Sequence, residues 1–432
     1  MSTFLYILIE SLKESAIVYY HYWWFFTPIV LWPIFELAWV SYIQEKYFRS
    51  IEWDLLEVKI SKEIEKRPKT MEEFFSGIYS TYDVMIDTLY DIYLGGVIDL
   101  WFSFEIVSKD GDIHFYIRTP KLSREIIESQ IYAQYSDAEI KEVDDYVTDI
   151  PDDIPSKDYD LWGTDMVLLK EDAYPLRTYK EFEDMASGEF IDSISNIVEG
   201  VSKLDKGEQI WIQILVRATD DSWKEDANSL VLKLIGRKDN EKKKSTNPFS
   251  IVIDELVDLA RYTILGAFST QEPKEKTDKE KSREEESISM MLHLSPGEKS
   301  VVTAIDESTR KPGFETDIRW IYLAKRDIFN KVKGNAIVFS YFTQFGLQDL
   351  NALIPNSNTK TSAYYFLTEL RKAMRKRKIL RKYKRREFDE KGYVLNTEEL
   401  ATIFHFPTIE VNAPVAPRID AKKGKPPSGL PV

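Results

Sequence analysis

The sequence contains no cysteine. This absence excludes disulfide bonds, cysteine-ligated zinc, iron–sulfur clusters and thiol nucleophiles. Histidine is also scarce: the four histidines stand at positions 21, 114, 293 and 405, without HxxxH or HExxH spacing. A histidine-based metal site is therefore not expected, and we predict that the protein uses no cofactor.

The common catalytic motifs are absent as well. The sequence has no Walker A, GxSxG or GxGxxG pattern. The stretch SPGEKS at 295–300 lacks the GxxxxGK[ST] spacing that a phosphate loop needs, and Ser295, Pro296 and Glu298 instead predict the start of a helix. Acidic clusters at 142–146, 149–153 and 180–184 could supply acid–base pairs, but surface loops explain them better. We therefore predict a protein that is not an enzyme, and a hydrolase is the least favoured hypothesis.

Long uncharged runs are rare in a chain with 30% charged residues, and residues 15–35 form one. This segment, SAIVYYHYWWFFTPIVLWPIF, has no Lys, Arg, Asp or Glu across 21 residues. A helix that spans the bilayer core needs roughly 20 apolar residues. We predict a membrane anchor within residues 1–50, and the alternative is a helix buried in a soluble core.

Aromatic residues support the membrane interpretation. Tryptophans gather at membrane interfaces, and this segment and its flank carry Trp23, Trp24, Trp32 and Trp39. Pro28 and Pro33 predict a kink, so a single span, a hairpin and an in-plane helix all remain open. Basic residues are more frequent after the segment than before it, which predicts that everything after Phe48 lies in the cytoplasm.

The rest of the chain predicts an α+β protein. Residues 51–146 read as β-α-β-β-α-β, the ferredoxin-like order, with Asp110 and Gly111 in a tight hairpin turn. A Pro- and Asp-rich linker follows at 147–160. Residues 161–407 predict a second ferredoxin-like module, with a helical insertion at about 220–312 and GYVL at 392–395 closing its sheet. Residues 408–432 form a Pro-rich tail.

The net charge is −14, yet residues 371–386 hold eleven basic residues and no acidic one. We predict a helix with Leu370, Met374 and Ile379 facing inward. Nucleic acid, anionic lipid, and acidic groups of this chain or of a partner protein are all candidate contacts. The candidate binding residues are Arg371, Lys372, Arg375, Lys376, Arg377, Lys378, Arg381, Lys382, Lys384, Arg385 and Arg386.

A short capped helix is predicted at 396–407, in NTEELATIFHFP. Asn396 or Thr397 caps it, Glu398 and Glu399 suit the positive end of the helix dipole, and Pro407 ends the apolar run. His405 is interpreted as a packed or capping residue.

Several segments together resemble one family. WDLLEVKISKEIEKRPKTMEEFF, GEQIWIQILVR, LSPGEK, VLNTEELATIFHFP and KPPSGLP are similar to the membrane-anchored amino-terminal regions of bacterial conjugation-type (HerA-like) type IV secretion ATPases. The resemblance implies a DNA-transfer machine as the context. It also implies a location at the bacterial inner membrane and DNA as a further candidate partner, and it is compatible with an oligomer. Because no Walker residues are present, either a P-loop motor ATPase acts in trans, or the chain is a stand-alone relative, or it is a truncated product. The alternative is a stand-alone membrane scaffold that binds protein partners or anionic lipid.

Overall fold

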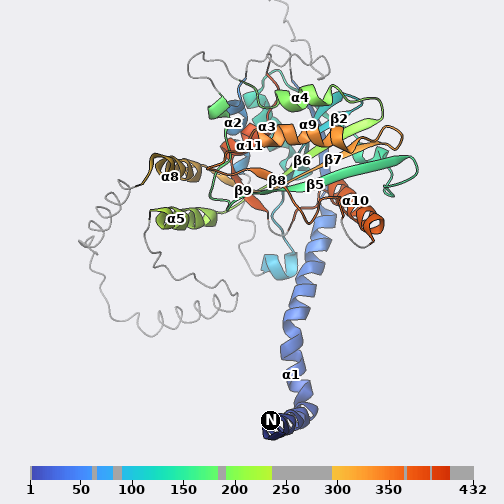
Figure 1. The fold of residues 1–432 in the computed structure, drawn as a ribbon, viewed down its shortest axis with the longest axis vertical. Helices are drawn as coiled ribbons and strands as arrows, with labels where there is room; N and C mark the ends of the chain where they lie inside the picture. The colour runs from blue at the N-terminus through green and yellow to red at the C-terminus, as the bar shows by residue number, and fades with distance from the viewer. Residues whose placement is uncertain are drawn as a thin grey trace, which may run out of the picture.

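The computed structural model describes residues 2–60, 66–80, 90–182, 191–235, 294–363, 367–389 and 392–408. These residues form an α+β fold: one antiparallel sheet with helices on both faces, from which a long helix projects (Figure 1). The strands are β1 (Trp53–Lys59), β2 (Phe102–Lys109), β3 (Asp112–Pro120), β4 (Glu139–Glu142), β5 (Tyr159–Leu168), β6 (Glu208–Ala218), β7 (Gly313–Lys325), β8 (Leu353–Pro355) and β9 (Tyr393–Asn396). The α-helices are α1 (Ser2–Ser50), α2 (Pro68–Tyr79), α3 (Arg124–Gln134), α4 (Ser195–Val201), α5 (Ser222–Leu234), α8 (Pro296–Thr309), α9 (Lys331–Thr343), α10 (Thr368–Arg385) and α11 (Thr397–Ile403).

The sheet is continuous across both halves of the chain. Its strand order is β4-β1-β3-β2-β6-β7-β5-β8, with β9 paired to β7. The elements β1-α2-β2-β3-α3-β4 follow the order predicted for 51–146. Apart from β9, each half of the chain contributes four strands. In both halves the fourth strand in sequence lies at the outer edge of the sheet, and the first, third and second strands follow toward the centre. The halves join where Glu105 of β2 pairs with Gln213 of β6, so they share one sheet.

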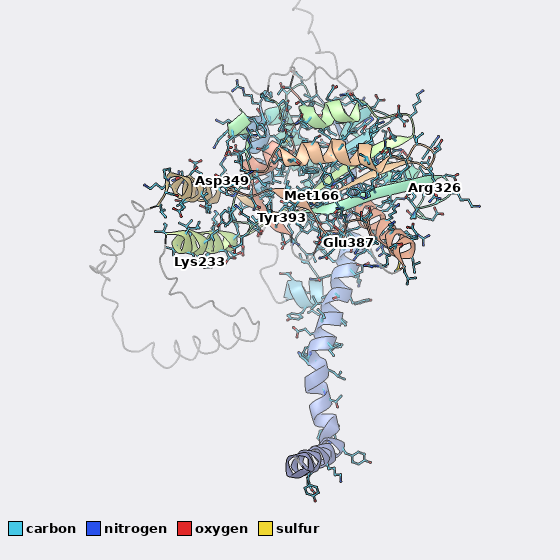
Figure 2. The ribbon with its side chains drawn as sticks, viewed as in Figure 1. Met166, Lys233, Arg326, Asp349, Glu387 and Tyr393 are labelled. Atoms are coloured by element: carbon cyan, nitrogen blue, oxygen red, sulfur yellow. The ribbon has the colours of Figure 1, made fainter. Side chains whose placement is uncertain are left out.

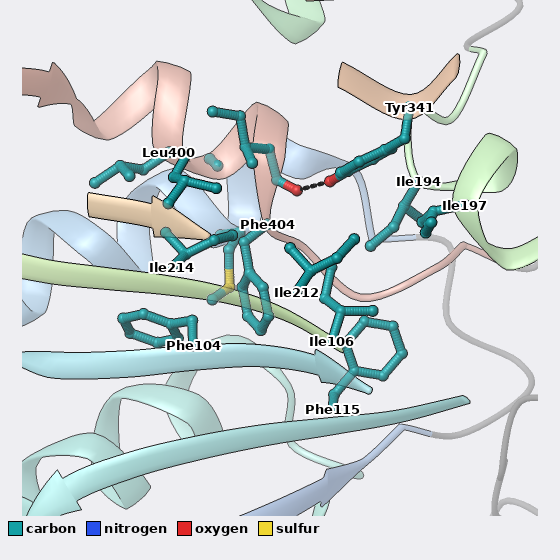
Figure 3. Close-up of a cluster of buried hydrophobic side chains, with 14 of the residues drawn as sticks. Phe104, Ile106, Phe115, Ile194, Ile197, Ile212, Ile214, Tyr341, Leu400 and Phe404 are labelled. Atoms are coloured by element: carbon teal, nitrogen blue, oxygen red, sulfur yellow. Dashed lines mark hydrogen bonds between the residues drawn. The ribbon is translucent and has the colours of Figure 1, made fainter. Parts of the chain in front are cut away.

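One face of the sheet carries the larger apolar core. Strand residues that alternate along the chain, such as Phe104 and Ile106, point toward α2, α3, α4, α9 and α11, because successive strand side chains face opposite sides. Figure 3 shows Phe104 near Phe404, which follows α11, with Leu400 of α11 in the same cluster. The Tyr341 hydroxyl donates a hydrogen bond to the Ile403 carbonyl oxygen, which fixes α11 to α9.

The opposite face is covered by α10 and by part of the predicted linker. Val147, Ile150 and Ile154 are buried there against strand residues and α10. The segment 147–160 therefore contributes to the core. Within the predicted insertion, α5 and α8 pack on one another through Ala227 and Ile305, and they lie together at one edge of the body (Figure 1). Residues 236–293 lie outside the described residues.

The predicted role of GYVL in closing the sheet is wrong. Tyr393–Asn396 forms β9, which pairs with residues 313–316 of β7, whereas β5 pairs with residues 318–325 of the same strand. Strand β9 therefore lies on the same side of β7 as β5, beyond the end of β5. It is not an outer strand of the sheet. The outer strand is β8, which pairs with residues 166–168 of β5.

Helix α1 leaves the body from the side on which α10 lies (Figure 1). It contains the uncharged segment, with Pro28 and Pro33 inside the helix. No helix within the described residues combines the length and the apolar character that crossing a bilayer requires. Large apolar side chains nevertheless face solvent along α1, among them Trp32, which is 62% exposed, and Leu37, which is 71% exposed.

The body-proximal end of α1 is firmly packed. Phe48 stacks on Trp101 with ring centroids 5.4 Å apart, and Ile43 is buried. The turn η1 (Asp91–Gly95) braces the half of α1 nearer the body: the indole nitrogen of Trp39 donates to the Tyr93 carbonyl oxygen at 2.7 Å. Gly96 follows in the left-handed region at φ +63°, and a Cβ there would lie 2.5 Å from the Ile43 carbonyl oxygen. Glycine is required because only it allows both this conformation and this close approach.

Candidate functional site

The basic run forms α10, as predicted. Glu369 lies in its first turn and Lys382, Lys384 and Arg385 in its last, which suits the helix dipole. The helix ends at Arg386, whose φ is +50° and whose backbone N–H bonds back to the carbonyl oxygens of the last turn. The prediction of which residues of this helix face inward is partly wrong. Ile379, Leu380 and Tyr383 are buried and form the side of the helix that packs on the sheet. Leu370 and Met374 lie on another side and are exposed.

Beneath α10, four polar residues form a row across the middle of the sheet. Glu105 pairs with Gln213, Gln213 with Arg319, and Arg319 with Asp165, so the row crosses β2, β6, β7 and β5. All four side chains are buried. We name these residues the central polar row. Buried charges need partners, and α10 supplies many of them.

Arg386 closes one end of the central polar row. Its Nε atom lies 2.9 Å from Oε1 of Glu105, and its guanidinium also pairs with Asp145. Tyr146 donates to Glu105 at 2.8 Å. Burial raises the pKa of Glu105, but Arg386 and the hydrogen bonds outweigh burial and hold that pKa below its usual range. The carboxylate is therefore ionised and paired.

Lys382 closes the other end. Its Nζ atom lies 3.1 Å from Asp165 and 2.6 Å from Asp389. Arg319 pairs with Asp165 and Asp317 on the same side of the sheet. Burial raises the pKa of Asp317, against the opposing effect of Arg319 and Lys382.

Asp152, in the acidic cluster at 149–153, and Asp160, near the start of β5, also contact α10. Lys384 pairs with Asp152 at 2.5 Å, and Lys376 pairs with Asp160 at 2.5 Å. Together with the Arg386–Asp145 pair, these contacts attach the 145–160 segment to the helix. A large part of the basic run is therefore neutralised by the protein's own carboxylates.

The eleven predicted binding residues thus divide into groups. Those held by contacts within the chain are Lys372, Arg375, Lys376, Lys382, Lys384 and Arg386. Arg371 is exposed near the start of α10. The remaining four are exposed and make no ion pair with the described residues: Arg377, Lys378, Arg381 and Arg385. We name these four the basic stripe.

The basic stripe borders a hollow in the surface of about 710 Å³. Basic side chains dominate its lining, and the single acidic residue in it, Asp152, is already paired with Lys384. Met374 adds an apolar wall and is 62% exposed. The hollow is therefore positively charged with an apolar margin, which suits an anionic group attached to an apolar body.

The predicted interfacial tryptophans occupy different settings on α1. Trp24 and Trp32 are exposed, while the side chain of Trp23 lies outside the described residues. Trp39 is partly exposed and stacks on Phe35 with ring centroids 6.3 Å apart. Because its indole nitrogen bonds to η1, Trp39 braces the helix as well as presenting an aromatic face.

The predicted capped helix is confirmed as α11. The Asn396 side chain accepts from the Glu399 backbone N–H, and Glu399 accepts from the Asn396 backbone N–H. Glu399 also accepts from the Leu176 backbone N–H at 2.7 Å. Burial raises the pKa of Glu399 to about 7. The same reciprocal capping by Ser295 and Glu298 begins α8. His405 is buried and contacts Asp192 at 2.7 Å, so it is a packed residue.

Sequence reasoning missed the central polar row. A charged residue inside an apolar strand was the available signal, since Arg319 interrupts TDIRWIYLA and Glu105 interrupts WFSFEIV. Within the described residues, no group of three or more His, Asp or Glu side chains is arranged to hold a metal ion.

The chain belongs to the family described as a domain of unknown function, DUF8128, whose model matches residues 44–418. The match covers the sheet, α10 and α11, and it begins near the body-proximal end of α1. No curated protein matches the sequence.

Proposed function

We propose that this protein is a membrane-attached, non-catalytic docking component of a type IV secretion- or conjugation-like DNA-transfer machine. Its body lies on the cytoplasmic side of the bacterial inner membrane and holds a P-loop motor ATPase that acts in trans. One observation carries the membrane part of the proposal. Helix α1 projects from the body (Figure 1), and apolar side chains between Trp24 and Leu37 are exposed on it.

The exposed apolar surface of α1 would be costly in water. Leu31, Trp32, Ile34 and Phe35 are each at least half exposed and follow one another closely. Burying apolar surface is worth about 25 cal/mol per Å², and monomeric soluble proteins rarely expose contiguous apolar patches of several hundred Å². Contact with the apolar part of a bilayer removes this surface from water, which supports attachment through α1.

We infer that the body consists of two ferredoxin-like units fused edge to edge. The support is the repeated strand arrangement, β4-β1-β3-β2 in one half and β8-β5-β7-β6 in the other. In each half, helices connect the strands in the order of a split βαβ motif. A rigid body of this kind suits a docking role, because one sheet fixes the relative position of both halves.

The proposed motor partner rests on the resemblance. In the secretion ATPases, the stretch that corresponds to VLNTEELATIFHFP leads into the motor domain. Here that stretch forms β9 and the buried helix α11. Because the proposed motor acts in trans, we expect the neighbouring gene to encode a P-loop ATPase without an anchor of its own. A neighbouring ATPase that already carries its own anchor and amino-terminal region would count against the motor partner.

Vesicle flotation of the full chain tests the membrane attachment. We expect the wild-type protein to float with neutral phosphatidylcholine vesicles. A stalk variant in which Leu31, Trp32, Ile34 and Phe35 are changed to Gln should remain at the bottom of the gradient. The control changes four exposed apolar residues of the body to Gln, namely Leu122, Leu169, Ile191 and Val332. Equal flotation of the stalk variant and the wild type would contradict attachment through α1.

DNA is the second candidate partner. The basic stripe has the charge that neutralises phosphates, and it is exposed. Salt-dependent binding of duplex DNA that is lost when the stripe is neutralised would support this function.

A further inference from the structure

We propose that the basic stripe of α10, together with the exposed residues Leu370 and Met374, is a second membrane contact that binds the phosphate headgroups of anionic lipids. This inference rests on the proposed membrane attachment through α1 and names the lipid class that the body itself recognises.

The first argument is the arrangement of the exposed side chains along α10. Leu370 and Met374 precede the stripe residues Arg377, Lys378, Arg381 and Arg385 on the exposed side. At 3.6 residues per turn, these six positions fall within an arc of about 100° and a length of about 22 Å. A helix with apolar and basic residues on one exposed face is typical of elements that lie on a lipid surface.

The second argument is that the four stripe residues make no ion pair with the described residues, while four other basic residues of the run pair with carboxylates. Lys376, Lys382, Lys384 and Arg386 pair with carboxylates of the body. These pairs fix the orientation of α10, so the basic stripe is held outward on a rigid helix. Clusters of basic residues beside a membrane-attached helix bind anionic headgroups, each contributing on the order of fivefold to the affinity.

The third argument is position. The indole nitrogen of Trp101 donates to the Arg386 carbonyl oxygen at 2.9 Å, and the Trp101 ring stacks on Phe48 of α1. The end of α10 and the base of α1 are thus linked through one side chain. Figure 2 shows the neighbouring residue Glu387 above the body-proximal end of α1. A membrane that holds α1 therefore lies on the side of the body to which α10 belongs.

The apolar residues favour lipid over nucleic acid. Met374 is 62% exposed and Leu370 is 57% exposed, and Met374 also lines the basic hollow. Phosphate contacts to DNA depend on basic and polar groups, so exposed Leu and Met side chains would gain nothing there. At a bilayer, the same side chains enter the apolar boundary beneath the headgroups.

Binding of the full chain to two kinds of vesicle tests the proposal. The vesicles contain phosphatidylcholine alone or phosphatidylcholine mixed with phosphatidylglycerol. We expect the wild-type protein to prefer the anionic vesicles by about tenfold or more, and we expect high salt to remove the preference. The basic-stripe variant, with Arg377, Lys378, Arg381 and Arg385 changed to Gln, should bind both vesicles equally.

A matched control removes the same charge elsewhere. It changes four exposed residues to Gln: Lys69 on α2, Lys206 in the loop before β6, Lys233 on α5 and Arg310 directly after α8. This control should keep the preference for anionic vesicles, and both variants should melt at the wild-type temperature. A preference that survives in the stripe variant, or that is absent from the wild type, would overturn the lipid site.

Two further outcomes separate the hypotheses. If the wild-type protein binds neither kind of vesicle, the proposed attachment through α1 fails along with the lipid site. If it binds both kinds equally, and duplex DNA binding depends on the stripe, the lipid site is wrong while the attachment stands. In that case the basic stripe is a nucleic-acid contact.

Discussion

Arg386 and Glu105, separated by 281 positions in the sequence, form a buried ion pair with Nε and Oε1 2.9 Å apart. Arg386 is 1% exposed and Glu105 is fully buried. The pair joins the end of α10 to the middle of β2. Because β2 is the strand that meets β6 between the two halves, this contact fixes α10 over the junction of the sheet.

Replacing Arg386 by Met should destabilise the protein by about 3–5 kcal/mol, because Glu105 would be left as an unpaired buried charge. Thermal or urea unfolding of the full chain measures the loss. The control is Arg385→Met, since Arg385 is adjacent but exposed, and its unfolding should match that of the wild type. Adding Glu105→Gln to the Arg386→Met variant should recover part of the loss. If Arg386→Met and Arg385→Met have the same stability, the pair is not what holds α10.

The buried carboxyl group of Glu399 predicts a pH-dependent stability. Its pKa rises from 4.5 to about 7 in the folded protein, so the folded state binds the proton more tightly than the unfolded state. This contribution is fully present below pH about 4.5 and is lost as the pH rises through about 7, amounting to at most about 3 kcal/mol.

The variant Glu399→Gln tests this dependence, because Gln cannot titrate and still suits the capping position. The difference in unfolding free energy between the wild type and the variant should change across this pH range and be constant above it. Glu225→Gln on the surface of α5 is the control for the removal of an exposed carboxyl group. A pH-independent difference for Glu399→Gln would show that the carboxyl group does not titrate in this range.

Changing Gly96 to Ala should weaken the attachment of α1 to the body. The new Cβ would lie 2.5 Å from the Ile43 carbonyl oxygen, at a backbone φ of +63°, so the base of α1 must shift. We expect faster hydrogen exchange in residues 36–50 and greater cleavage there by a protease. Gly297→Ala is the control because no atom lies within 4 Å of its Cβ position. Unchanged exchange in Gly96→Ala would contradict the close contact.

Local signals in the sequence predicted much of the fold. The Asn396 and Ser295 caps, the Asp110–Gly111 turn and the β-α-β-β-α-β order all depend on neighbouring residues, and the structure contains each of them. The partners of α10 depend on long-range contacts. Lys376 and Asp160, for example, are 216 positions apart. No local pattern distinguishes Lys376, which is paired, from Lys378, which is exposed, so the basic run could not be divided from sequence alone.

The same limit explains the errors in strand and helix placement. Strand β8 has only three residues, which is too short for a periodic pattern. The GYVL segment forms a strand, but which strand it pairs with depends on the length of β7, which extends past the end of β5. The spacing of Leu370 and Met374 along the helix is compatible with a buried apolar face. Which face of α10 is buried depends instead on the residues that it packs against, such as Trp211.

Fractionation of cells that produce the full chain tests the central claim of membrane attachment most directly. The wild-type protein should sediment with the inner membrane and remain there after a high-salt wash, because apolar contacts of α1 are insensitive to screening. The stalk variant, with Gln at positions 31, 32, 34 and 35, should move to the soluble fraction. Recovery of the wild-type protein in the soluble fraction would contradict the proposed function.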